Sequence, residues 1–268
     1  MRSRGSSSAP VAAAARAAGI DVRAVLSNDI VGDLTGPQRA ASARRIRLFS
    51  EGLPIPFSDA ALDEARRLGG LADGPSRQLA RHVADVADAH ALAVRPLLVA
   101  RADRFLRGGD HTAFTEQGFA AVRFTEVAES YDHQHQDVRI GGGRGYGDLP
   151  EFVDAEQSRR GRAVNAAALA HLANAPSPPP GFAPVVEGPD PATTLRWQRS
   201  PEPDVVGYEL LRRSSDAAPL GQARRGAGGR TEVTTQEQGS LALRGALGRD
   251  RDGYRSPPAF PRLEQSGR

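Results

Sequence analysis

The sequence predicts an α/β domain followed by a small β domain. Short apolar runs typical of strands alternate with helical segments over roughly the first 175 residues, and alternating strands and helices indicate a layered α/β domain. The composition then changes at 176–191, where a Pro-rich linker is expected, and strand-like runs follow it. A chain of 268 residues is long enough for one large domain or two smaller ones.

The α/β part is expected over residues 1–175. Apolar clusters predict strands over 22–30, 45–49, 94–100 and 121–124. Helices are predicted over 11–18, over 73–91, around Phe114 and over 149–173. The clearest helix follows the start signal Asp-Gly-Pro-Ser, after which Leu79, Val83 and Val86 keep helical spacing.

The C-terminal part is expected over residues 192–264, with strands at 193–197 and 205–211. Between 221 and 248, Gly and Arg are dense and apolar alternation is missing. We therefore expect irregular backbone there, from a disordered insertion or from a stretch read in the wrong frame.

Composition excludes several functional classes. The chain has no cysteine, which excludes disulfides, thiol catalysis and Cys-based zinc sites. All 35 basic residues are arginine against 32 acidic ones, and no basic stripe is interleaved with aromatics, so nucleic-acid binding is not expected. No apolar run reaches the roughly 20 residues of a membrane helix, so no membrane partner is expected. The N-terminal segment lacks the apolar core of a signal peptide.

Asp29 stands in Ser-Asn-Asp-Ile-Val-Gly at the end of a predicted strand. Ligands of open α/β sheets bind just outside the carboxyl ends of strands, which makes Asp29 a candidate site residue. An ordinary turn is the alternative, because Asn-Asp before Gly is typical of turns.

Asp110 and His111 follow Gly-Gly in a loop ahead of a predicted short helix. These two side chains could orient a ligand or accept a metal. The alternative is a helix start in which Asp110 is the N-cap residue.

Two histidines and two acids lie close together in Tyr-Asp-His-Gln-His-Gln-Asp, residues 131–137. Neutral imidazole and carboxylate are ligands of zinc, so His133, His135 and Asp137 could belong to a metal site. A solvated polar loop is the alternative.

The combination of these motifs, in this order, resembles the two-zinc aminopeptidases of peptidase family M twenty-eight. The resemblance runs through Asn-Asp-Ile-Val-Gly, Arg-Ala-Asp-Arg-Phe-Leu-Arg-Gly-Gly-Asp-His, Ala-Val-Arg-Phe-Thr-Glu and His-Gln-His-Gln-Asp, within residues 11–174. It implies a truncated three-layer αβα domain with a mixed sheet, corresponding to the C-terminal half of the catalytic domain.

The resemblance also implies a chemistry. Two zinc ions activate a water, a glutamate takes its proton, and hydroxide attacks the N-terminal peptide bond of a peptide substrate. Asp29 then matches one metal ligand and His133 the late histidine ligand. Asp110 and His111 match a loop beside the site, His135 a second-shell or substrate-side residue, and Asp137 a residue that orients the His133 loop.

Other residues that the family uses should precede Asp29: a first histidine, a bridging aspartate and a Glu pair that includes the general base. The 28 residues before Asp29 contain no His and no Glu. We therefore expect no catalytic base and an inactive, truncated peptidase. The alternative is a non-catalytic interaction protein with an aminopeptidase-like scaffold.

The C-terminal part resembles a fibronectin type III module, forming a small, partly irregular β-sandwich. The similarity rests on Leu-Arg-Trp at 195–197, Asp-Val-Val-Gly-Tyr-Glu-Leu at 204–210 and Asp-Gly-Tyr-Arg-Ser-Pro at 252–257, with Trp197 in the core. Such modules bind protein or glycan partners or serve as spacers. Members of the aminopeptidase family are often secreted or periplasmic, but no compartment is predicted here.

Overall fold

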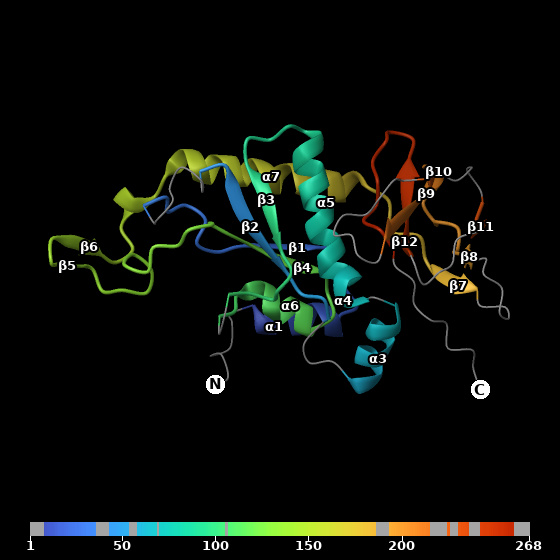
Figure 1. Ribbon diagram of the computed structural model, residues 1–268, viewed down its shortest axis with the longest axis horizontal. Helices are drawn as coiled ribbons and strands as arrows, with labels where there is room; N and C mark the ends of the chain where they lie inside the picture. Colours follow the sequence, from blue (N-terminus) through green and yellow to red (C-terminus); the bar gives the residue numbers. More distant parts are fainter. Residues whose placement is uncertain are drawn as a thin grey trace. The chain divides into compact units, whose positions relative to one another are not determined.

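The computed structural model describes residues 8–35, 43–53, 58–68, 70–104, 107–185, 193–214, 224–225, 230–235 and 242–259. The chain divides into two compact units (Figure 1). The first contains Met1–Ile55 and Pro75–Ala170, and the second contains Pro56–Gly74 and His171–Arg268. The structure is mixed α/β, with one mixed sheet and smaller antiparallel sheets.

A four-stranded sheet in the order β1-β4-β2-β3 forms the centre of the first unit. Its strands are β1 (Val25–Asn28), β2 (Arg45–Ser50), β3 (Arg95–Val99) and β4 (Ala121–Thr125). β1 runs parallel to β4 and β3 parallel to β2, whereas β2 and β4 are antiparallel. The sheet is therefore mixed, as expected, and β4 is buried along its whole length.

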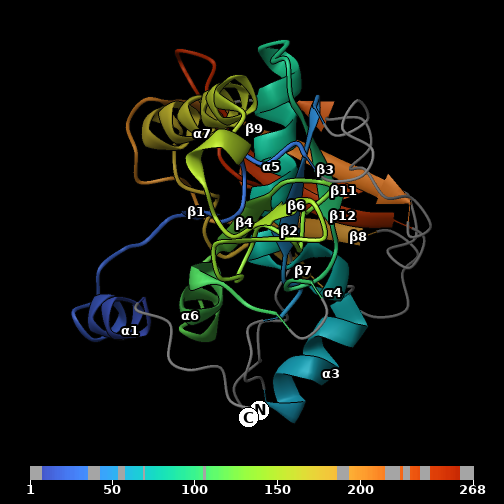
Figure 2. The same ribbon diagram turned by 90° about the vertical axis from the view of Figure 1, so that its left-hand side faces the viewer.

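Helices cover both faces of this sheet. Gly161 of α7 (Ala155–Asn174) lies against Ile46, whereas Gly109, just before α6 (Asp110–Glu116), lies against Arg123. Arg123 pairs with Phe49, which points away from the Ile46 face because side chains alternate along a strand. α6 and α7 thus lie on opposite faces, as Figure 2 shows, and the first unit has three layers.

The helix expected over 73–91 is α5 (Pro75–Ala89), which packs on β2, β3 and β4. Its apolar side chains Leu79, Val83 and Val86 are buried. The short helix expected around Phe114 is α6, and the one expected over 11–18 is α1 (Ala9–Ala17), which contacts α6.

Before α7 the chain forms a β-hairpin that the sequence reading did not predict. Strands β5 (Arg139–Gly141) and β6 (Arg144–Tyr146) are joined by Gly142 and Gly143, whose φ values are 57° and 77°. Two consecutive positive φ values are typical of a type I′ hairpin turn, which favours glycine. The predicted helix over 149–173 is correspondingly shorter: Pro150–Phe152 is a 3-10 turn, η1, and α7 begins at Ala155.

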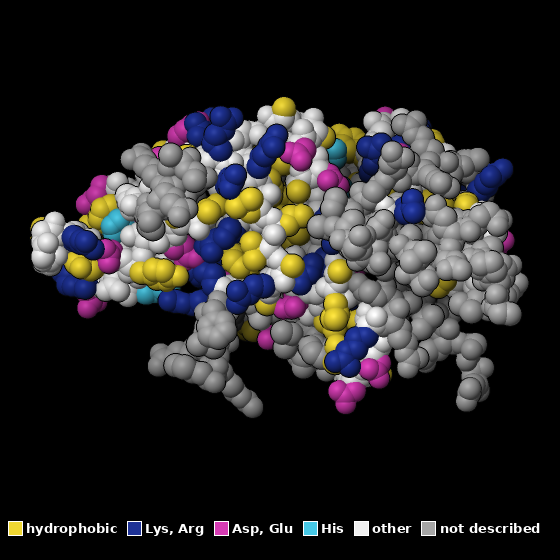
Figure 3. All heavy atoms as spheres, in the orientation of Figure 1, with side chains coloured by type: hydrophobic (Ala, Val, Ile, Leu, Met, Phe, Trp, Pro, Cys, Tyr) yellow, Lys and Arg dark blue, Asp and Glu magenta, His cyan; other side chains and the backbone are white. Residues whose placement is uncertain are grey.

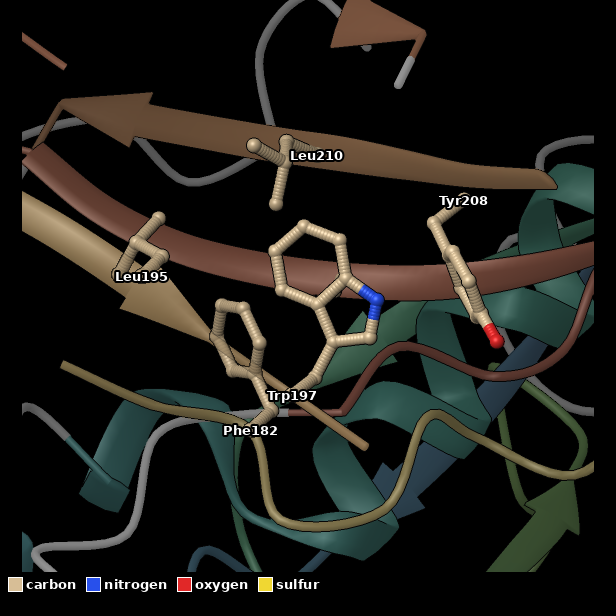
Figure 4. Packing of buried hydrophobic residues seen from close by; sticks show 6 residues of the cluster. Phe182, Leu195, Trp197, Tyr208 and Leu210 are labelled. Carbon is tan, nitrogen blue, oxygen red and sulfur yellow. The ribbon is translucent and has the colours of Figure 1, made fainter. Parts of the chain in front are cut away.

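The second unit contains two three-stranded antiparallel sheets. One has the order β11-β8-β7 and the other β10-β9-β12. The elements are α3 (Asp59–Leu68), α4 (Gly70–Asp73), β7 (Ala183–Val185), β8 (Thr193–Arg196), β9 (Val205–Ser214), β10 (Arg224–Arg225), β11 (Glu232–Thr235) and β12 (Ala242–Asp250). Figure 4 shows its core, in which Trp197 packs between Phe182, Leu195, Tyr208 and Leu210.

Two expectations for the C-terminal part are corrected. The expected Pro-rich linker at 176–191 contains strand β7, which pairs with β8. Pro184 is tolerated in it because β7 is an edge strand of the sheet. The expectation of irregular backbone over 221–248 is wrong for β11, which pairs with β8, and for β10 and most of β12, which both pair with β9. Residues 186–191, 221–223, 226–229 and 236–241 of these two stretches lie outside the described residues.

The face in Figure 3 carries dark blue and magenta side chains interspersed over the sheet unit, with yellow side chains gathered over β2 and β3. Leu98 of β3, at a sheet edge, is 48% exposed. In the part of the chain that is described, no helix has the length and apolar character needed to span a membrane.

Candidate functional site

Asp29 directly follows β1, at the end of the sheet where β4 also ends. Its backbone N–H donates to the carbonyl of Phe124, which extends the pairing of β1 and β4 by one step. Its carboxylate Oδ2 lies 2.8 Å from Nη2 of Arg123 in an ion pair. The sequence placed Asp29 at the carboxyl end of a strand, and the structure agrees.

The next residue has an unusual backbone. Ile30 has a φ of 57°, in the left-handed region that β-branched residues rarely adopt. Its carbonyl accepts hydrogen bonds from the N–H of Glu126 at 2.8 Å and from Oγ1 of Thr125 at 3.0 Å. The end of β4 thus holds a strained backbone beside Asp29, a feature that clusters at functional sites.

The His133 ring is fixed from two sides. Its Nδ1 lies 2.6 Å from Oδ2 of Asp33 and 2.9 Å from Oγ1 of Thr35. Phe152 stacks on the ring with a centroid distance of 3.5 Å and an interplanar angle of 2°. Both of these polar contacts are made by Nδ1, so neither of them uses Nε2, the second nitrogen of the ring.

Glu126 supports the loop that carries Asp33. Its Oε2 accepts a hydrogen bond of 2.7 Å from the backbone N–H of Asp33, and the residue is 1% exposed. Burial raises the pKa of Glu126 to about 8, so the carboxyl group is mainly protonated at neutral pH. A neutral Glu126 can lie near the Asp33 carboxylate without strong repulsion.

A buried charge network joins Asp29 to the rest of the sheet. It consists of three arginines and three acids, in the order Arg47, Glu129, Arg104, Asp103, Arg123 and Asp29, each in an ion pair with the next. The side chains of Glu129, Asp103 and Arg123 are 3%, 2% and 0% exposed. Burial at this level requires paired charges, which this network supplies.

Asp110 and His111 lie at the start of α6. The N-cap residue is Gly109 rather than Asp110, so the N-cap alternative is wrong by one residue. His111 is 1% exposed, its Nε2 lies 2.7 Å from the carbonyl of Ala102, and burial lowers its pKa. A neutral His111 that donates Nε2–H to this carbonyl ties α6 to the loop after β3.

The roles expected for His135 and Asp137 stay predictions. His135 is exposed and has a φ of 56°. Asp137 is also exposed, and its carbonyl accepts from Arg139. The carboxylate that contacts the His133 ring belongs to Asp33, which the sequence reading missed. The sequence signal that could have found Asp33 is the Asp-Leu-Thr turn at 33–35, in which the backbone N–H of Thr35 donates to the Asp33 carboxylate.

The described side chains do not fit a complete metal centre. Across the ranges of chain that the structure describes, no group of three or more His, Asp or Glu side chains could hold a metal ion. The two expected ligands, Asp29 and His133, each contact a protein group, Arg123 and Asp33 respectively.

Comparison with known proteins identifies relatives but no matching family model. A probable zinc metalloprotease of Pyrenophora tritici-repentis is 37% identical over 243 residues, which cover 90% of this chain and 50% of that protein. A probable zinc metalloprotease of Pyrenophora teres f. teres is 40% identical over 200 residues, covering 74% of this chain and 41% of that protein.

Similar solved structures include an Fn3-like protein from Clostridium thermocellum, at 18% identity and a TM-score of 0.27, covering 34% of this chain and 100% of that chain. Another is the fn3 domain of human collagen alpha-1(XX), at 23% identity and a TM-score of 0.27, covering 35% of this chain and 95% of that chain.

Homologues that are named probable zinc metalloproteases thus cover most of this chain. The chain spans about half the length of the first of these relatives and 41% of the second.

Proposed function

We propose that this chain is part of a zinc-dependent metallopeptidase of the aminopeptidase type, acting on the N-terminal bond of a peptide. The observation that carries the proposal is the similarity to probable zinc metalloproteases over 90% of the chain at 37% identity. The order of the motifs around Asp29, Asp110, His111 and His133 supports the aminopeptidase type, because it resembles the two-zinc aminopeptidases. In this proposal Asp29 and His133 are ligands of different zinc ions.

We also propose that the chain alone is not a competent peptidase. Metal-activated hydrolysis needs a firmly held metal and a base for the attacking water. Within the described ranges there is no group of three metal-binding side chains. The buried Glu126 is engaged by the Asp33 backbone, so it is no free base for a substrate water.

A non-catalytic scaffold is the second candidate. It is favoured by the ion pair of Asp29, since Arg123 occupies the carboxylate of this expected ligand without any metal. The C-terminal unit would then bind a protein or glycan partner.

A chimera tests the class of enzyme. The matching segment of the Pyrenophora tritici-repentis relative is replaced by residues 1–175 of this chain, after the relative itself has been shown to release an amino acid from an aminoacyl-anilide. We expect the chimera to keep zinc-dependent release, and the Asp29→Asn and His133→Ala versions to lose it. A folded but inactive chimera would contradict the peptidase proposal and favour the scaffold.

Assays of the purified chain test the proposal that it is not a competent peptidase by itself. We expect fewer than two zinc ions per chain and no release of amino acid from the same substrate. Binding of two zinc ions together with zinc-dependent release would overturn the proposal that this chain is inactive alone.

A further inference from the structure

Arg123 occupies an unusual position for an arginine. It stands on the buried central strand β4, and its side chain is 0% exposed. Nη1 pairs with Asp103 and donates to the carbonyl of Gly108 at 3.2 Å, while Nη2 pairs with Asp29 at 2.8 Å. The guanidinium therefore bridges Asp29 to the loop that precedes α6.

The two partners of this ion pair differ in their freedom. The Asp29 side chain is 46% exposed and could swing into solvent, whereas Arg123 is enclosed. If the carboxylate moved away, the guanidinium would stay buried without this partner, which is costly for a charge held out of water. Arg123 thus sets the position of the pair, and Asp29 approaches it.

Charge balance gives Asp29 a definite role in the network. Arg47, Arg104 and Arg123 carry three positive charges, and Asp103, Glu129 and Asp29 carry three negative ones. Without the Asp29 charge the network keeps one excess positive charge. A divalent cation at Asp29 would instead place two positive charges beside a guanidinium that has nowhere to go.

We infer that Arg123 is the built-in cation partner of Asp29, and that a metal ion can use the Asp29 carboxylate only by displacing this guanidinium. The inference rests on the proposed function and deepens it, since it says which group must move before a zinc ion can use Asp29. It concerns only the partner of Asp29, so it can fail or hold whether or not the chain belongs to a peptidase.

The first experiment changes only Asp29, the half-exposed end of the network. Zinc is titrated into the wild-type chain and the Asp29→Asn variant in competition with a chromophoric chelator. Equal zinc affinities are expected, because Asp29 is already occupied in the wild type. A loss of affinity of about tenfold or more in Asp29→Asn would show that zinc uses Asp29 despite Arg123 and would overturn the inference.

The second experiment removes the guanidinium. Because Arg123→Gln alone leaves Asp103 buried without this partner, the variant tested is Arg123→Gln with Asp103→Asn, which removes one charge of each sign. We expect zinc affinity to rise at least about tenfold, because a neighbouring unit charge at low effective dielectric changes ion binding strongly. The gain should vanish when Asp29→Asn is added.

The same double variant can contradict the inference. If it folds, as judged by its far-ultraviolet circular dichroism, an unchanged zinc affinity means that Arg123 does not block Asp29. A gain that survives the Asp29→Asn change means that zinc uses other groups. If the double variant does not fold, the inference is tested by the first experiment, which compares the zinc affinities of the wild type and Asp29→Asn.

Discussion

Nδ1 of His133 lies 2.6 Å from Oδ2 of Asp33, a contact between residues 100 positions apart in the chain. It joins the loop after β1 to the loop after β4. Thr35 reaches the same ring nitrogen at 2.9 Å, so the imidazole is held in one orientation by a single turn.

Asp33→Ala is expected to lower the free energy of unfolding by about 1–3 kcal/mol, because a charge-assisted hydrogen bond is lost in a partly enclosed site. The matched control is Asp137→Ala, an exposed carboxylate on the same loop as His133, with an expected change within about 0.5 kcal/mol. Urea unfolding followed by circular dichroism measures both. Equal losses would show that Asp33 does not hold the ring.

Glu126→Gln should give a stability gain that depends on pH. Burial raises the pKa of Glu126 from 4.5 to about 8, so the folded state holds this proton more tightly than the unfolded chain does. The stability that the protonated Glu126 contributes to the folded state is therefore complete below about pH 4.5 and is lost as the pH rises toward 8. The variant should exceed the wild type by about 1–3 kcal/mol near pH 7.

The two proteins should have similar stability near pH 4, where the carboxyl group is protonated in both states. Denaturant unfolding at both pH values measures the difference. A Glu126→Gln variant that is equally stabilised at acid and neutral pH would contradict the protonated, buried carboxyl group.

Two glycines of the β5–β6 region can be compared, Gly143 in the hairpin turn and Gly147 directly after β6. Gly147 has a φ of 100°, and a Cβ there would lie 2.8 Å from the Cα of Val138. Gly143 has a φ of 77°, but a Cβ there would meet nothing within 4 Å. Gly143→Ala should cost about 1 kcal/mol of backbone strain, and Gly147→Ala clearly more, as measured by the thermal midpoint. The reverse order would contradict this packing.

The core of the second unit can be followed by Trp197, the single tryptophan of the chain. Leu195→Ala removes a side chain that is 2% exposed, and we expect a loss of about 2–5 kcal/mol in unfolding followed by tryptophan fluorescence. Val206→Ala, at a position 45% exposed, is the control and should change stability by well under half as much. Similar losses would mean that Leu195 is not a core residue.

Much of the fold could be predicted because local patterns and tertiary structure agree. β2 and β4 begin where the apolar runs predict, and α5 follows from its start signal and the spacing of Leu79 and Val83. The β5–β6 hairpin was missed because its strands are only three residues long and not alternating, although Gly142 and Gly143 indicated a turn. β7 was missed because prolines dominate its surroundings, yet an edge strand tolerates them.

The candidate site was harder to predict. Asp29 lies at the end of β1 as the pattern indicates, but its partner Arg123 comes from a strand far along the chain. An arginine between apolar residues in Ala-Val-Arg-Phe-Thr indicates a buried ion pair, but it does not indicate which acidic residue is the partner. The role of Asp137 came from the resemblance to the aminopeptidases, whereas Asp33 reaches the His133 ring through the folding of the sheet. Whether Asp29 and His133 bind zinc stays a prediction.

The pairing of β1 with β4 also has a kinetic consequence. Among the described strands β1 has one neighbour, and Val25 pairs with Ala121, nearly a hundred residues later. Closing so long a loop costs conformational entropy before the contacts between β1 and β4 can form, so β1 should join the sheet late in folding. In native-state hydrogen exchange the amides of β1 should exchange earlier than those of β4, since a strand that docks last is expected to open first.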